Sequence, residues 1–247
     1  MKKTLITLAS LWLISSSPAA TVNTYDSHVL LKWPVYVNTS ISDKSEEVYL
    51  PKLEKSLKSI EGKLPKYAYD YLRDSGLKII VVPPHTIKND FKMLYVMENT
   101  SNWTRKYEKF LDNSVVIPTG LFSNLDDFNF LYFMTHELAH HYHFSFVGYS
   151  NEYVWRKYWH AKRDPNYPLT YGLENHVELF AELSVNFFIM REKLAKIDKE
   201  GMNLMNYIWG EKFFKSRMKL YNSLPTVDMK AIMERETARK NKIFNIK

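Results

Sequence analysis

The chain has 247 residues, a formal net charge of +7 and no cysteine. Disulfides, cysteine-ligated zinc and cysteine nucleophiles are therefore excluded, so the fold must depend on its core and on any metal it binds. Hydrophobic residues make up 45% of the sequence, enough for a sizeable core. The basic residues are dispersed and accompany no zinc-finger spacing or RNP-type aromatic pattern, so nucleic acid is not an expected partner.

Residues 1–20 have the layout of a secretory signal peptide. Lys2 and Lys3 form a basic start, about thirteen mostly apolar residues follow, and the segment ends in small residues. The apolar stretch is too short for a transmembrane helix, which needs roughly 20 residues. We therefore expect cleavage after Ala19 or Ala20, a secreted or periplasmic mature chain, and no stable membrane anchor after cleavage.

The first half of the mature chain is predicted to mix strands with helices. β-Branched and aromatic residues indicate a strand at 28–37, in which Pro34 requires an edge position or a bulge. Leucines and an isoleucine recur at helical spacing over 50–64 and predict an amphipathic helix. The other elements expected here are a short helix ending at Gly76, a strand at 77–82, loops with room for one helix at 85–112, and a strand at 114–118.

The second half is predicted to be almost entirely helical. Asp126 or Asp127 can cap a helix that runs to about Phe144. No internal repeat or flexible linker divides the chain, so we expect a single α+β domain over 21–247, with a small mixed sheet in its N-terminal half and an extended helical C-terminus. The further helices are expected near 151–162, 174–193, 202–222 and 228–240.

The most informative segment of the chain is His136-Glu137-Leu138-Ala139-His140. Residues four apart on a helix lie on one face, a single turn from each other. His136 and His140 can therefore direct two imidazoles at one metal ion, and imidazole suits zinc. Glu137 is then available as the general base that takes a proton from water activated by the metal. An ordinary helix that happens to carry two histidines is the alternative.

A third ligand is needed, because catalytic zinc sites use three protein ligands and one open position. Glu178 and Glu182 lie one turn apart on a predicted helix with an apolar side, where a buried carboxylate is costly unless it is paired or metal-bound. We predict Glu178 as the third ligand and Glu182 as the hydrogen-bond acceptor that orients a ligand histidine. Two solvated glutamates are the alternative.

Two other histidines lie close to the motif. His143 follows His136 by seven residues and can also face the metal. However, His143 and Phe146 stand where the metzincin pattern has its glycine and its third histidine, which excludes that pattern. We expect His141 and His143 to be exposed or to lie behind the ligands.

The segment LTYG at 169–172, followed by ELFAE at 178–182, resembles the catalytic signature of the anthrax lethal factor-like peptidases. That family includes the secreted Pro-Pro endopeptidases. In it a tyrosine precedes the third zinc ligand by seven residues, as Tyr171 precedes Glu178 here. About 65 residues follow Glu182, more than in a minimal catalytic domain of the family, and no lethal factor-like targeting domain is apparent.

The resemblance implies a zincin-like metallopeptidase domain of the gluzincin type. It implies that an extended substrate pairs with an edge strand, for which 114–118 is the candidate. It also implies a hydrogen bond from Tyr171 to the oxyanion or the leaving amine, with Glu137 as general base. The zinc ligands that it implies are His136, His140 and Glu178.

These features predict a secreted zinc-dependent endopeptidase. We expect it to bind one zinc ion per chain, to act on peptide or protein substrates, and to be a monomer. One alternative is a secreted binding protein on an inactive peptidase fold, although none of the five residues named for the chemistry is missing. Another is a basic surface-interaction protein, which rests only on the lysines and arginines near the C-terminus.

Overall fold

A computed structural model of the chain describes residues 24–87, 92–97 and 109–223. The predicted signal peptide at 1–20 and the predicted helix near 228–240 lie outside the described residues. Within them, a five-stranded mixed sheet occupies the N-terminal half and helices dominate the C-terminal half, so the α+β prediction is confirmed. No helix in the described part of the chain is long and apolar enough to cross a membrane.

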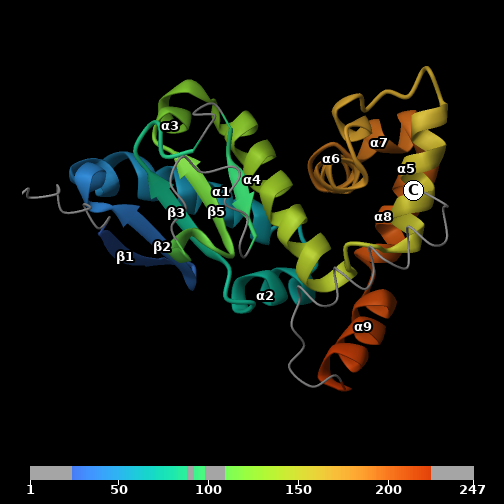
Figure 1. Cartoon of the computed structure of the whole chain (residues 1–247), viewed down its shortest axis with the longest axis horizontal. Helices are drawn as coiled ribbons and strands as arrows, with labels where there is room; N and C mark the ends of the chain where they lie inside the picture. Colours follow the sequence, from blue (N-terminus) through green and yellow to red (C-terminus); the bar gives the residue numbers. More distant parts are fainter. Residues whose placement is uncertain (1–23, 88–91, 98–108, 224–247) are drawn as a thin grey trace, which may run out of the picture.

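The sheet consists of β1 (Tyr25–Leu30), β2 (Trp33–Asn38), β3 (Lys78–Val82), β4 (Leu94–Val96) and β5 (Ser114–Pro118). Its strand order is β1-β2-β3-β5-β4 (Figure 1). The three inner strands, β2, β3 and β5, run parallel, whereas β1 and β4 pair antiparallel at the two edges. Parallel strands are normally covered on both faces, and β5 is accordingly buried along its whole length.

The segment predicted as one strand at 28–37 is instead an antiparallel hairpin of β1 and β2. The two strands are joined by Leu31 and Lys32, whose φ angles are 51° and 70°. Two successive residues in the left-handed region make a tight turn. At this turn the sequence has no glycine, asparagine or aspartate, the residues that usually mark such a turn. Pro34 fits in β2 because the pairing of β2 with β3 begins only at Val35.

β4 lies in a segment for which the sequence predicted loops, and its presence changes which strand is at the edge. The strand at 114–118, β5, pairs with β3 on one side and with β4 on the other. It is an inner strand, so the prediction that 114–118 is the edge strand is wrong. β4 has only three residues, too few for a periodic pattern to be recognised in the sequence.

The two faces of the sheet are covered differently, because successive strand residues point to opposite sides. Ile79 and Val81 of β3 join the main core, which the helices α1 (Leu50–Glu61) and α4 (Asp127–Tyr142) complete. Ile80 joins a smaller cluster with Val116 of β5, Val96 of β4 and apolar residues outside the strands such as Ile87. The helices α2 (Lys66–Asp74) and α3 (Gly120–Asn124) complete this half of the molecule.

The C-terminal half consists of α5 (Glu152–Arg163), α6 (His176–Ile189), α7 (Arg191–Ile197), α8 (Lys199–Ile208) and α9 (Glu211–Ser223). Figure 1 shows α4 between the sheet and the group formed by α5 to α8. The single helix predicted at 174–193 is broken at Met190, which ends α6 and precedes α7. The one predicted at 202–222 is broken near Gly210, where a Cβ would lie 2.6 Å from the Asn206 carbonyl oxygen.

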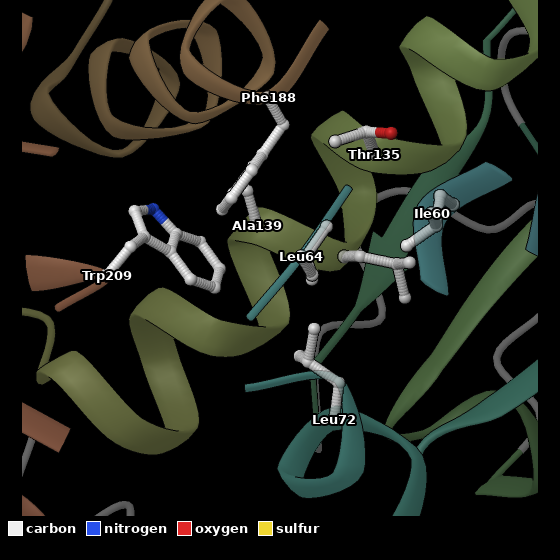
Figure 2. Close-up of a pocket in the computed structure, with 8 residues that line it drawn as sticks. Ile60, Leu64, Leu72, Thr135, Ala139, Phe188 and Trp209 are labelled. Atoms are coloured by element: carbon white, nitrogen blue, oxygen red, sulfur yellow. The ribbon is translucent and has the colours of Figure 1, made fainter. Parts of the chain in front are cut away.

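α4 begins as predicted, because the Asp126 side chain accepts a hydrogen bond from the Asn129 N–H at 2.7 Å. One of its faces borders an apolar crevice between α1 and α2 on one side and the C-terminal helices on the other (Figure 2). Around the crevice, α4 packs against helices of both halves of the molecule. The residues around the crevice are Ile60, Leu64, Leu72, Thr135, Leu138, Ala139, Phe188 and Trp209.

Candidate metal centre

Three side chains predicted as ligands converge on one point between α4 and α6. His136 Nε2 lies 3.0 Å from His140 Nε2 and 3.0 Å from Glu178 Oε2. The His140 Nε2 atom lies 3.4 Å from the same Glu178 oxygen. Among the described residues, this is the one group of at least three histidine, cysteine or acidic side chains arranged to hold a metal ion.

The donor set fits a tetrahedral metal ion. Bonds of about 2.0–2.1 Å at tetrahedral angles hold two donors about 3.3 Å apart, close to the three separations here. Burial raises the pKa of the Glu178 carboxyl, but hydrogen bonds to His136 and His140 lower it more, and the net pKa is well below its ordinary value. Glu178 is therefore ionised, which is the form that binds a metal.

Local structure brings Glu178 to the histidines. The Asn175 side chain caps α6 by accepting hydrogen bonds from the N–H groups of Val177 and Glu178, at 2.9 and 3.0 Å. The turn before this cap packs tightly on the helix, because a Cβ at Gly172 would lie 2.9 Å from the Leu179 side chain. A glycine beside Tyr171 thus lets the turn approach the helix that carries Glu178, the predicted third ligand.

Glu137, the predicted general base, is buried beside the three predicted ligands and faces β4. Its Oε2 accepts a hydrogen bond from the Tyr95 N–H at 2.7 Å. Burial raises the pKa of Glu137 to about 7, against the opposing effects of His136 and of the Tyr95 hydrogen bond. A carboxyl with a pKa near neutrality is suited to both accepting and releasing a proton.

Tyr171 lies at the same site, in the short 3-10 turn Tyr171–Leu173. Its ring centroid is 5.8 Å from that of His136, and the residue is 36% exposed. Burial, followed by the negative charge of Glu178, raises the pKa of the Tyr171 phenol. Tyr171 therefore keeps its proton and remains a hydrogen-bond donor. The ammonium of the exposed residue Lys92 lies 5.5 Å from the centroid of the Tyr171 ring.

Glu182 lies behind His136, but the predicted hydrogen bond is not formed. Its Oε1 is 3.6 Å from His136 Nδ1, an ion-pair distance that is long for a hydrogen bond. Its Oε2 accepts a hydrogen bond from the Tyr132 hydroxyl at 2.7 Å. Tyr132 was not predicted, although it precedes His136 by one helical turn and so shares its face of α4.

His141 and His143 were predicted to be exposed or to lie behind the ligands, and of these two options exposure is excluded because both side chains are buried. His141 lies between Ser75 and Tyr95, and burial lowers its pKa to about 3. The His143 ring is completely buried and stacks on Phe180 with centroids 4.5 Å apart. Neither histidine joins the three converging donors. Both are buried because α4 and the turn that follows it pack against neighbouring elements, and the spacing of the histidines in the sequence does not reveal this packing.

Comparison of the chain with family models, with curated protein sequences and with solved structures finds no match.

Proposed function

We propose that the chain is a zinc-dependent endopeptidase with a zincin-like catalytic domain, similar to the lethal factor-like peptidases that its motifs resemble. One observation carries the proposal. Glu178 of α6 meets His136 and His140 of α4 at 3.0 and 3.4 Å, with ionised Glu178 as the third donor. Two histidines and one glutamate form a recognised zinc set in peptidases, and it leaves one coordination position open.

The residues around this set have distinct tasks in peptide hydrolysis. Bound zinc supplies Lewis-acid activation of water and of the scissile carbonyl. Glu137 accepts a proton from the attacking water and delivers one to the leaving amine. Tyr171, still protonated, donates a hydrogen bond to the oxyanion as its charge develops. Glu182 lies next to Nδ1 of His136 and favours the ring orientation that presents Nε2 to the metal.

β4 is the strand beside which we place an extended substrate. Tyr95 uses its N–H to bind Glu137 rather than β5, so the outer edge of β4 faces the site. A peptide laid along such an edge would bring its scissile bond next to the general base. The substrate class is therefore an extended peptide or unfolded protein segment. The sequence layout of residues 1–20 supports export of the enzyme.

The test is a cleavage profile of the purified mature protein on a peptide library. It is run with zinc, with a chelator, and after zinc is restored to the chelated sample. We expect cleavage that the chelator abolishes and zinc restores, with about one zinc per chain by elemental analysis. Glu137→Gln protein, purified identically, is the control for a contaminating protease. A zinc-loaded protein that cleaves nothing in the library would favour an inactive binding protein instead.

A further inference from the structure

Tyr95 is attached to α4 at two points. Its N–H donates to Glu137 Oε2 at 2.7 Å, and its hydroxyl oxygen lies 3.1 Å from Nδ1 of His141. Glu137 and His141 are four residues apart, so they lie on the same face of the helix. The backbone and the side chain of one strand residue therefore hold consecutive turns of the helix that carries the base and two ligands.

The direction of the side-chain hydrogen bonds from Tyr95 through His141 to Ser75 follows from the carbonyl oxygen at the end of the series. Ser75 Oγ lies 2.7 Å from the Leu72 carbonyl oxygen, which can only accept, so the serine donates there. Ser75 Oγ also lies 2.6 Å from His141 Nε2, and it must accept from an Nε2–H. The neutral ring then has a free lone pair on Nδ1, to which Tyr95 donates. Asn113 Oδ1, 3.4 Å from the Tyr95 hydroxyl, is the more distant acceptor.

This attachment matters because β4 is weakly held by the sheet. It is three residues long and, within the described residues, it pairs with β5 alone. So short a strand at an edge has few main-chain hydrogen bonds to keep its position. The side chain of Tyr95 also contacts the rings of His141 and Phe144, with centroids 5.4 and 6.0 Å away. Contacts with α4 and with the turn that follows it therefore add substantially to the few sheet bonds that hold Tyr95.

We propose that Tyr95 and His141 are positioning residues for the general base. They keep the Tyr95 N–H against one oxygen of Glu137, so that the other oxygen stays free to exchange protons with water. The expected effect on turnover rests on the proposed peptidase function, whereas the link between β4 and α4 does not depend on it.

The experiment combines kinetics with amide exchange. Tyr95→Phe removes one hydroxyl and keeps the ring. We expect kcat to fall by about 3- to 30-fold, a fraction of the full contribution of a general base, with unchanged zinc content. His141→Phe should have a similar effect from the other side of the bond. In a Glu137→Gln background, Tyr95→Phe should lower the residual rate no further, because the base it positions is already lost.

Tyr69→Phe is the matched control. The Tyr69 hydroxyl is buried and accepts a hydrogen bond from Trp33 Nε1 at 2.9 Å, away from the site. Its loss should lower the melting temperature and leave kcat unchanged. A purely structural role for Tyr95 predicts the same pattern, so an unchanged kcat in Tyr95→Phe overturns the proposal. An equal loss of rate in the wild-type and Glu137→Gln backgrounds also overturns it.

Amide hydrogen exchange at Tyr95 separates this proposal from the proposed function. The Tyr95 N–H should be protected in the metal-loaded wild type and exchange at least about 10-fold faster in Tyr95→Phe. If the wild type cleaves no peptide but the protection falls, the peptidase assignment fails and the link between Tyr95 and His141 is supported. If the protection is unchanged, the link itself is overturned, whatever the activity.

Discussion

Tyr132 donates a hydrogen bond to Glu182 at 2.7 Å, and the other oxygen of that carboxylate lies 3.6 Å from Nδ1 of His136. The corresponding nitrogen of His140 is buried and has no hydrogen-bond partner among the described residues. The two histidines proposed as ligands are thus supported differently. His136 has a carboxylate behind it that a phenol fixes in turn, whereas the orientation of His140 depends on packing.

Glu182→Gln should weaken zinc binding. Loss of an outer partner of a ligand histidine typically lowers metal affinity by about 10- to 100-fold. Tyr132→Phe should have a smaller effect in the same direction, because it leaves the carboxylate in place. Zinc affinity is measured by competition with a chromophoric chelator. Glu192→Gln, at an exposed position of α7, is the control, and an affinity of Glu182→Gln equal to that of the control would contradict the role of Glu182.

His140→Ala should lose zinc and activity together. It removes one of three donors, so zinc affinity should fall by more than the roughly 100-fold that an outer partner contributes. Elemental analysis after gel filtration measures the metal directly. His160→Ala removes an exposed histidine that faces Glu200 and should retain about one zinc per chain. Retention of zinc by His140→Ala would mean that another residue, such as the nearby His143, is the ligand.

Glu137→Gln should retain zinc and lose turnover. The amide has nearly the same shape as the carboxylate, but it cannot accept the proton of the attacking water. We expect kcat to fall by about 10²- to 10⁴-fold, the usual contribution of a general base. Single-turnover kinetics on a peptide found in the library measure this loss, and zinc content is measured on the same samples. Near-normal turnover would exclude Glu137 as the base.

Tyr171→Phe should lower kcat by about 10- to 1,000-fold and leave KM and zinc content nearly unchanged, because the lost hydrogen bond strengthens only as the oxyanion forms. The melting temperature should change little, since the ring stays. Tyr153→Phe, at another partly exposed tyrosine, is the control and should be silent. A silent Tyr171→Phe would make Tyr171 an ordinary turn residue and would weaken the likeness to the lethal factor-like peptidases.

The metal-free protein should lose a contribution to its stability as pH rises, because of Glu137. Burial raises its folded pKa from 4.5 to about 7. Folding therefore favours the protonated carboxyl. The resulting contribution to the free energy of unfolding is fully present below about pH 4.5 and is lost as pH rises through about 7. A shift of this size corresponds to about 3 kcal/mol at most.

Urea unfolding of metal-free wild type and metal-free Glu137→Gln, at pH 5 and pH 8, measures this contribution. The other titrating groups are common to both proteins. The wild type should therefore lose more unfolding free energy than the variant between these two pH values. Identical pH dependence in both proteins would show that Glu137 titrates normally.

Several local features were predictable from the sequence. Asp126 caps α4 as expected, Gly76 (φ 78°) follows α2, and the leucine spacing of α1 matches its buried face. The positions of His136 and His140 on one helix face follow from the helical repeat alone. These features depend on residues within a few turns of each other in the chain, so the spacing of residues in the sequence predicts them directly.

Other features were decided by tertiary structure. The hairpin at Leu31 and Lys32, the edge strand β4, and the break between α6 and α7 have weak local signals, since longer-range packing selects them. The Tyr95 N–H meets Glu137 only because β4 pairs with β5 and lies against α4. Such partners lie about 40 residues apart, and a short-range periodic pattern in the sequence cannot predict that they are in contact.

The candidate metal centre combines both kinds of information. The sequence by itself determined which side chains can ligate, because His136, Glu137 and His140 share one helix and the spacing of Tyr171 to Glu178 suggested the rest. Only the packing of α4 on α6 determined that Glu178 meets both imidazoles and that Glu182 is bound by Tyr132. Helical spacing fixes directions within one element, whereas the distance between two elements depends on the whole core that separates them.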